Sequence, residues 1–460
     1  MKNMTLAAIA AACNGTLYYA DNADCNGAVA TQVIIDSRQI VPGGVFIATP
    51  GERVDGHTFI PQVFEKGALG VVCQTLPDKE YGPCILVEDS FEALRAIANY
   101  YRDQIDAKVV GITGSVGKTS TKEFVASVVS EKYNTWKTQG NFNNEIGVPL
   151  TLLQVEEDTE VLVLEMGINH FGEMTRLSAM GRPDMVVITN IGQCHLEYLG
   201  DRDGVLKAKT EVFSSMNKDG TVILNGDDDK LITVKDVYGK QPLYFGRGED
   251  RDYYVTSSDN LGLLGTKAVL KSRKSGMTVT ADIPLPGDHM VSNALAAMAV
   301  GEALGLSDSQ IAAGIAKVQA TGGRSNIIKG DNYTVIDDCY NANPTSMKSA
   351  VDLLLTAKTS KVAILGDMFE LGDNSKLLHR QVGEYAGASG VDVVVCIGEL
   401  SKDMYEGACE VQGAMTYYYE NMDAALTALP HILQAGDSIL VKASHSMGFS
   451  KIVDMLTKKE

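Results

Sequence analysis

The chain has 460 residues, which is enough for two to four domains, and its 45% hydrophobic and 21% charged residues are typical of a globular protein. The formal net charge of −18 argues against a nucleic-acid partner and against an anionic membrane surface, because both favour a basic protein face. The eight cysteines form no CxxC pair and predict reduced thiols in a cytoplasmic protein, and the sequence contains no run of about 20 apolar residues that would predict a membrane span.

Residues 1–104 are predicted to form a first domain, in which short strands alternate with turns and helices. Its first 15 residues are expected to form a helix that ends at Asn14-Gly15; a weak signal peptide is the alternative. The predicted strands are VIIDSR (33–38), GGVFIA (43–48), LGVVC (69–73) and CILVED (84–89), and the helix SFEALRAIANYYRDQ (90–104) closes the domain.

Residues 105–320 are predicted to form a second domain with a strand-then-helix rhythm. Continuous apolar strands of the buried parallel kind are expected in AKVVGIT (107–113), EVLVLEM (160–166), DMVVITNI (184–191) and GTVILNGDDD (220–229). A β-rich excursion over 241–286 precedes the helix MVSNALAAMAVGEAL (290–304). Polar residues follow the strands directly, at the edge where open α/β sheets bind ligands.

Residues 321–460 repeat the α/β rhythm and are predicted to form a third, Rossmann-like domain. Its expected strands are YTVIDD (333–338), KVAILGD (361–367), DVVVCIG (392–398) and DSILVKA (437–443). The predicted fold class is therefore α/β, with three domains and a central P-loop-type domain that contains a mostly parallel sheet.

The stretch TGSVGKTS (113–120) lies between a predicted strand and a predicted helix, and a plain glycine-rich turn is the alternative to a phosphate-binding loop. Glycines allow backbone angles that turn several amides toward phosphate oxygens, the helix N-terminus favours negative charge, and a GKT sequence adds a lysine for the outer phosphates and a hydroxyl for magnesium. The residues expected to bind a nucleoside triphosphate are Gly114, Ser115, Gly117, Lys118, Thr119 and Ser120.

Two further strand ends of the same sheet carry candidate metal ligands. Glu165 ends one strand and His195 follows the next; each could instead be solvated or structural. Lys209 alone predicts only a surface lysine, since an ammonium group would repel magnesium unless carbon dioxide converted it to a carbamate.

These motifs resemble those of the Mur ligase family, ATP-dependent amide-forming enzymes of bacterial cell-wall synthesis. The loop TGSVGKTS fits the family's pattern, in which the first glycine of a strict P-loop is displaced by one residue. The stretches QGNFNNEIGVPLTLL (139–153), LEMGINHFGE (164–173), NIGQCHLEYLG (190–200) and AKTE (208–211) follow in the family's order, so the resemblance covers essentially the whole chain.

The resemblance implies roles for residues that composition and spacing leave unassigned. Magnesium, with two ions expected, would be held by Thr119, Glu165, His195 and a carbamylated Lys209, of which the last three would be catalytic together with Lys118. In the nucleotide site, PGDHMVSNALAA (286–297) supplies His289 and Asn293 for adenine, Arg324 would contact the terminal phosphate and Asp338 the ribose. Two departures from the family pattern are Met290, where asparagine is usual, and His445, where arginine is common.

The outer domains indicate which Mur ligases are most similar. Residues 36–60 resemble the UDP-binding domain of two family members and suggest Ser37 and Arg38 as contacts of the uridine diphosphate; the alternative for Arg38 is an ordinary ion pair. The stretches DDCYNANPTSM (337–347), LGDMFELG (365–372) and VKASHSMGFSKIV (441–453) resemble those of members that add D-alanyl-D-alanine to UDP-N-acetylmuramoyl-tripeptide. Candidate contacts of the dipeptide are Asn341, Asn343 and Ser444; the two asparagines could equally serve only to build the turn before Pro344.

The resemblance implies an acyl-phosphate route, in which ATP activates a carboxylate that the amine then attacks. Closure of the third domain, with a hinge expected near 318–323, would bring the two together and exclude water. A monomer is expected, because three closing domains need no partner. The alternatives are the sibling ligase that adds a diamino acid, a catalytically silent nucleotide-binding relative, and a simple ATPase or kinase.

Overall fold

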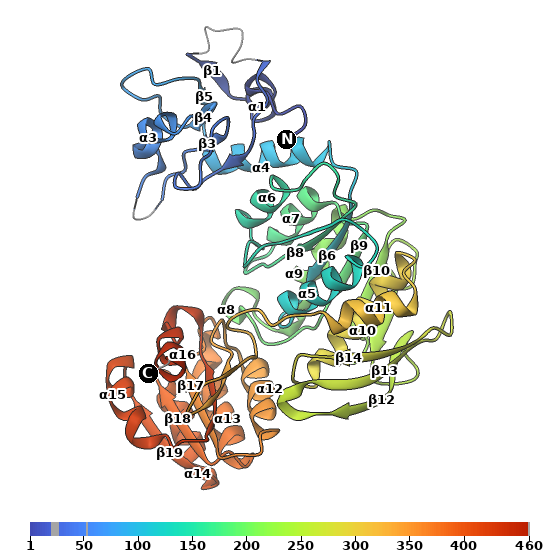
Figure 1. Cartoon of the computed structure of the whole chain (residues 1–460), viewed down its shortest axis with the longest axis vertical. Helices are drawn as coiled ribbons and strands as arrows, with labels where there is room; N and C mark the ends of the chain where they lie inside the picture. The colour runs from blue at the N-terminus through green and yellow to red at the C-terminus, as the bar shows by residue number, and fades with distance from the viewer. Residues whose placement is uncertain (20–26, 52–53, 459–460) are drawn as a thin grey trace.

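The computed structural model describes residues 1–19, 27–51 and 54–458, in which three separate sheets follow one another along the chain. The N-terminal and C-terminal domains lie at opposite ends of the molecule with the central domain between them (Figure 1). This confirms the predicted three-domain α/β architecture; the exact boundaries after residues 104 and 320 stay predictions. No helix of the described residues is long and apolar enough to cross a bilayer.

The N-terminal domain contains a five-stranded sheet in the order β1-β5-β4-β3-β2, in which only β1 runs antiparallel to its neighbour. The four predicted strands and both predicted helices are present, and residues 52 and 53 of the 36–60 motif lie outside the described residues. The elements are α1 (Leu6–Ala12), β1 (Thr16–Tyr18), β2 (Val33–Ile34), β3 (Val45–Ile47), α3 (Ile60–Glu65), β4 (Gly70–Cys73), β5 (Cys84–Leu86) and α4 (Ser90–Arg102).

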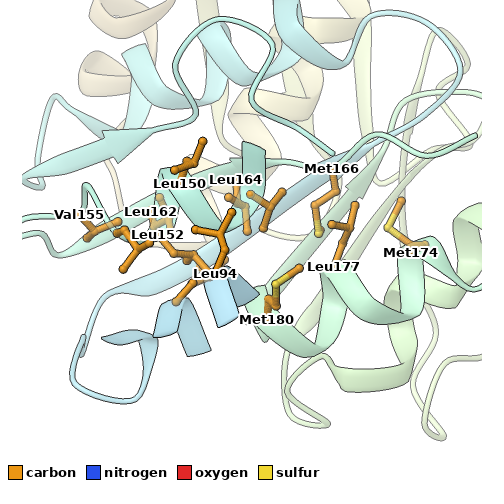
Figure 2. Packing of buried hydrophobic residues seen from close by; sticks show 14 of the residues in the cluster. Leu94, Leu150, Leu152, Val155, Leu162, Leu164, Met166, Met174, Leu177 and Met180 are labelled. Carbon is orange, nitrogen blue, oxygen red and sulfur yellow. The ribbon is translucent and has the colours of Figure 1, made fainter. Parts of the chain in front are cut away.

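Helix α4 joins this domain firmly to the next one. Asp89 caps its first turn by accepting from two backbone amides, and its apolar face enters a core shared with the central domain. Figure 2 shows Leu94 of α4 among leucine and methionine side chains of the central domain. Tyr101, 1% exposed, also donates to the carbonyl of Val155 at 2.8 Å. The first two domains therefore share one apolar core.

The central domain contains a nine-stranded sheet in the order β14-β13-β12-β11-β10-β9-β6-β8-β7. Its strands from β6 to β12 pair in parallel. The predicted β-rich excursion contains β11, β12, β13 and β14, of which the last three are antiparallel neighbours. The strands are β6 (Lys108–Thr113), β7 (Thr135–Lys137), β8 (Val161–Glu165), β9 (Met185–Ile188), β10 (Thr221–Asn225), β11 (Leu243–Gly246), β12 (Tyr253–Asn260), β13 (Thr266–Ser272) and β14 (Thr278–Ile283). The helices are α5 (Lys118–Val129), α6 (Gly147–Leu152), α7 (Glu173–Gly181), α8 (Leu196–Leu199), α9 (Arg202–Thr210), α10 (His289–Ala303) and α11 (Asp308–Ala316).

The C-terminal domain contains a six-stranded sheet in the order β15-β16-β20-β17-β18-β19, parallel except for β15. Its four predicted strands correspond to β16, β17, β18 and β20, which lie side by side at the centre of the sheet. The elements are β15 (Asn326–Lys329), β16 (Thr334–Asp337), α12 (Pro344–Leu355), β17 (Lys361–Gly366), α13 (Ser375–Ala388), β18 (Val393–Ile397), α14 (Ser401–Val411), β19 (Met415–Tyr419), α15 (Met422–Ile432), β20 (Ser438–Lys442) and α16 (Ser450–Thr457).

Candidate active site

A cavity of about 580 Å³ lies between the central and C-terminal domains and collects most of the predicted site residues. The central domain contributes residues at or after the ends of β6, β8 and β9 and at the start of α10, and the C-terminal domain contributes residues that precede β15 and that follow β16. The predicted residues that line it are Ser115, Gly117, Lys118, Ser120, Glu165, His195, His289, Asn293, Arg324, Asp338, Asn341 and Asn343.

The loop between β6 and α5 has the backbone conformation that its glycines predict. Gly114 has φ of +147°, and a β-carbon there would lie 1.9 Å from Thr189 Oγ1, so no other residue fits without displacement of the loop. Gly117 has φ of +83° and caps α5. The first amides of a helix have no partner within it, and these face a cavity suited to phosphate.

Lys118 Nζ lies over this loop and donates to the carbonyls of Gly114 at 2.9 Å and Ser115 at 3.4 Å. Burial lowers the pKa of the Lys118 ammonium, and the nearby charge of Glu165 opposes this shift. The Lys118 ammonium therefore lies where the outer phosphates of a nucleotide are expected.

Glu165, at the end of β8, is completely buried and held by several donors. Thr119 Oγ1 donates to its two carboxylate oxygens at 2.8 and 3.0 Å, and Asn143 Nδ2 donates to Oε1 at 2.8 Å. Hydroxyl and carboxylate oxygens are the ligands that magnesium prefers, so this pair fits the implied metal. The described residues contain no group of three or more His, Cys, Asp or Glu side chains that could hold a metal ion.

A buried lysine that the sequence did not reveal stands behind this carboxylate. Lys122, 1% exposed, lies one turn after Thr119 on α5, with Nζ 3.8 Å from Glu165 Oε2 and 3.2 Å from Glu123 Oε1. The same Nζ donates to the carbonyl of Thr138 at 2.8 Å. Since an isolated buried charge is costly, Lys122 compensates the charge of Glu165.

His195 and Lys209 occupy different surroundings. His195 precedes α8 with φ of 52°, lines the cavity, and pairs through Nδ1 with Glu370 Oε2 of the C-terminal domain. This hydrogen bond lowers the pKa of Glu370. Lys209, in the last turn of α9, is 1% exposed and outside the cavity lining; burial lowers its pKa to about 8. The alternative interpretation of Lys209 as an ordinary surface lysine is therefore wrong.

The predicted adenine contacts begin α10. His289 lines the cavity, and burial lowers its pKa against the opposing charge of Asp338. Asn293 is 6% exposed, and its Oδ1 accepts from Thr121 Oγ1 at 2.9 Å. Met290 is 1% exposed and outside the lining, with its sulfur 3.4 Å from Asn293 Nδ2. Met290, which replaces the asparagine usual in the family, therefore lies behind Asn293.

On the opposite wall, Arg324 stacks its guanidinium 4.0 Å from the ring centroid of Tyr340, and Tyr340 in turn lies 5.2 Å from the ring of His445. Asp338 accepts from the Ser325 amide at 2.9 Å and from Lys442 Nζ at 2.6 Å. The two predicted nucleotide contacts of the C-terminal domain, Arg324 and Asp338, therefore both face the cavity.

The candidate dipeptide contacts are held largely by structural bonds. Asn343 caps α12 by accepting from the Ser346 amide at 2.9 Å, and the Asn341 carbonyl accepts from Lys442 at 2.9 Å. Ser444 is 5% exposed, lies outside the cavity lining, and accepts from the Phe369 amide at 3.1 Å. The turn-building alternative therefore accounts for the Asn343 side chain in this structure.

Comparison with known proteins accounts for all three domains. Three family models match: "Mur ligase family, catalytic domain" over residues 30–102, "Mur ligase middle domain" over 112–301, and "Mur ligase, glutamate ligase domain" over 323–445. The chain belongs to the Mur ligase family. As a Mur ligase it is an ATP-dependent ligase, which agrees with the nucleotide-binding geometry of the loop at 113–120.

Individual Mur ligases match this chain over nearly its whole length. A Bacillus subtilis UDP-N-acetylmuramoyl-tripeptide–D-alanyl-D-alanine ligase is 38% identical over 431 residues and 92% of each chain, and its Escherichia coli counterpart is 34% identical over 460 residues and 99% of each chain. Among solved structures, MurF from Acinetobacter baumannii superposes with a TM-score of 0.87 at 32% identity over 99% of both chains. MurF from Thermotoga maritima in complex with ADP gives 0.79 at 26% identity, over 92% of this chain and 96% of that one.

Ser37 and Arg38 lie in the N-terminal domain of this Mur ligase and do not line the interdomain cavity. The Arg38 guanidinium forms a two-pronged contact with Asp36 at 2.8 and 2.9 Å and lowers the pKa of that carboxyl to about 2. Ser37 is 6% exposed, and its carbonyl accepts from Lys66 Nζ at 2.9 Å. The ion-pair alternative for Arg38 is thus present in the structure.

Proposed function

We propose that this protein joins D-alanyl-D-alanine to UDP-N-acetylmuramoyl-tripeptide, converting ATP to ADP and phosphate, in the synthesis of peptidoglycan precursors. The observation that carries the proposal is the cavity in which the phosphate loop and Glu165 face Arg324 and Asp338 from another domain. The relatives named for this reaction match over nearly their whole length, which supports the same substrates for this chain.

The chemical task is to form an amide from a carboxylate and an amine. A carboxylate is a poor electrophile, so its oxygen first attacks the γ-phosphorus of ATP; ADP leaves and an acyl phosphate forms. Lys118 and Arg324 approach the cavity from two domains and would offset charge that builds on the transferred phosphoryl group. The amine then attacks the acyl carbon, and phosphate leaves as the amide forms.

Magnesium would be held by Thr119, Glu165, His195 and Lys209 in its carbamate form, with two ions expected. When bound, the metal supplies positive charge that stabilises the transferred phosphoryl group. The Thr119 hydroxyl, which now donates to Glu165, would turn its oxygen lone pair toward the metal, while Asn143 and Lys122 would keep their contacts with the carboxylate.

Carbamylation of Lys209 requires a neutral amine to attack carbon dioxide, and a pKa of about 8 makes that form available near neutral pH. Equilibrating the protein with ¹³C-bicarbonate should therefore give a carbamate resonance in its ¹³C NMR spectrum. That resonance should be missing from Lys209→Ala; its persistence in the variant would assign the carbamate to another lysine.

The remaining contacts follow from the same proposal. Asn341 and Asn343 at the cavity wall, together with the buried Ser444, would position the dipeptide. Ser37 and Arg38 would bind the uridine diphosphate once the Arg38 guanidinium leaves Asp36 and contacts phosphate instead. We place the reaction in the cytoplasm, where ATP is available and thiols stay reduced, and expect a monomer.

Product analysis tests the amine specificity. The protein is incubated with ATP, magnesium and UDP-N-acetylmuramoyl-tripeptide, together with equal amounts of D-alanyl-D-alanine, D-alanine, D-glutamate and diaminopimelate. Mass spectrometry should detect only the product that carries the dipeptide. In a second incubation, UDP-N-acetylmuramoyl-dipeptide replaces the tripeptide acceptor. A product that carries diaminopimelate would then assign the activity of the sibling ligase.

A further inference from the structure

The contact between His195 and Glu370 joins two domains across 175 residues of sequence. His195 Nδ1 lies 2.5 Å from Glu370 Oε2, and the side chains are 20% and 40% exposed. The structure gives the ring no second hydrogen bond among the described residues, so Nε2 remains available on the wall of the cavity. One ring nitrogen is therefore fixed by the C-terminal domain while the other is left for a ligand.

Hydrogen bonds hold the two residues that precede Glu370 in its loop. The amide of Met368 donates to Nε2 of the buried His379 at 2.9 Å, and the amide of Phe369 donates to Ser444 Oγ at 3.1 Å. Glu370 itself has φ of 60°, a conformation that glutamate rarely adopts. These bonds present the Glu370 carboxylate in a defined direction.

The central domain meets this loop with a matching surface. His195 also has a positive φ, of 52°, and Leu196 packs against the apolar core of the C-terminal domain. A β-carbon on Gly372 would lie only 3.4 Å from the Glu197 Cα atom, so the two backbones approach closely. The pair therefore belongs to a packed interdomain contact in which two unusual backbone conformations face each other.

We propose that Glu370 is a positioning residue that holds His195 in the tautomer able to bind the metal, and so couples the position of the C-terminal domain to the metal site. A neutral imidazole that donates from Nδ1 carries its lone pair on Nε2, and histidine ligands of metals commonly donate their other N–H to a carboxylate. The proposal rests on the proposed function, because that function assigns the amine to the C-terminal domain. The metal site would then be completed only when that domain is docked.

The tautomer gives the first test. The His195 signals in ¹⁵N-histidine spectra of the full-length protein are identified by their loss in the His195→Asn variant. In the wild type, the Nδ1–H tautomer of His195 should dominate. Glu370→Ala should shift His195 toward the Nε2–H tautomer, Glu370→Gln should lie between, and Asp373→Asn should match the wild type. Asp373 is an exposed carboxylate three residues further along the same loop. A dominant Nε2–H tautomer in the wild type would overturn the proposal.

Metal binding gives a second readout that needs neither peptide substrate. Mn²⁺, titrated with ADP and followed by electron paramagnetic resonance, should bind Glu370→Ala about 10- to 100-fold more weakly than the wild type. If Glu370→Ala bound Mn²⁺ as tightly as the wild type or more tightly, the His195–Glu370 pair would serve only to hold the two domains together. If the wild type did not bind Mn²⁺, His195 would not be a metal ligand. Either outcome contradicts the proposal. Failure of D-alanyl-D-alanine ligation alone would refute the proposed function and leave these two measurements interpretable.

Discussion

Replacing Lys122 by methionine tests whether the buried lysine compensates Glu165. Methionine keeps most of the volume of the side chain but removes Nζ, which lies 3.8 Å from Glu165 Oε2 and donates to the Thr138 carbonyl. A buried acceptor that loses its donor costs about 1–3 kcal/mol, and a buried charge that loses its partner costs about 3–5 kcal/mol.

Glu165 keeps its bonds from Thr119 and Asn143, so we expect the lower end of both ranges, a total of about 4 kcal/mol. In the Glu165→Gln background the Thr138 carbonyl still loses its donor, while Glu123 keeps its ion pair with Lys137, so the same replacement should cost about 1 kcal/mol. The difference, about 3 kcal/mol, is at the upper end of the coupling energies expected for residues in one network.

Hydrogen exchange measured by mass spectrometry gives the opening free energies of α5 and β8 directly, without assuming that three domains unfold together. The wild type, both single variants and the double variant complete the cycle, and Lys274→Met, at an exposed lysine, is the matched control. If Lys122→Met costs the same in both backgrounds, Lys122 does not act on Glu165 and this account of the buried pair is wrong.

Three further predictions follow. Gly114→Ala should weaken ATP binding at least tenfold by calorimetry, because its β-carbon would collide with Thr189 at a strongly positive φ; unchanged affinity would contradict this geometry. Tyr340→Ala should raise the KM for ATP about 3- to 30-fold through loss of the Arg324 stack, whereas Tyr340→Phe should not. Burial lowers the pKa of His379, so protection of the C-terminal domain in hydrogen exchange should fall as pH drops below about 6.5, and His379→Gln should lose this dependence.

The sign of the pH effect follows from proton uptake. The unfolded chain binds a proton at the ordinary histidine pKa, while the folded imidazole accepts from the Met368 amide at Nε2 and resists protonation. Acid therefore favours the unfolded state, and the contribution of His379 to stability is present above the unfolded pKa and is lost as pH falls through the lower, folded one.

The sequence predicted the strands best where they are continuous and buried. Strand β8 and strand β17 consist of apolar runs with clear ends, so both the strands and the polar positions after them could be found. The missed strands β1, β7, β15 and β19 lie at sheet edges, where pairing on one side suffices and the apolar pattern is weak.

Within the site, the sequence predicted residues that belong to motifs and missed those whose role depends on contacts between distant segments. In the sequence, Lys122 lies in the helix after the phosphate loop and resembles an exposed helix residue. It is buried because it packs against Thr138, next to β7. Glu370 lies in the motif LGDMFELG (365–372), but its contact with His195 exists only when two domains meet. Arg38 is the opposite case. Its residue type suits phosphate, but its guanidinium is already paired with the neighbouring carboxylate of Asp36.

The most direct test of the central claim is phosphate release from ATP with magnesium, measured with each peptide substrate omitted in turn. We predict turnover only when UDP-N-acetylmuramoyl-tripeptide and D-alanyl-D-alanine are both present, because phosphate leaves as the amide forms. Sustained phosphate release with ATP alone, or the absence of release with both substrates, would contradict the assignment of this chain as the D-alanyl-D-alanine-adding ligase.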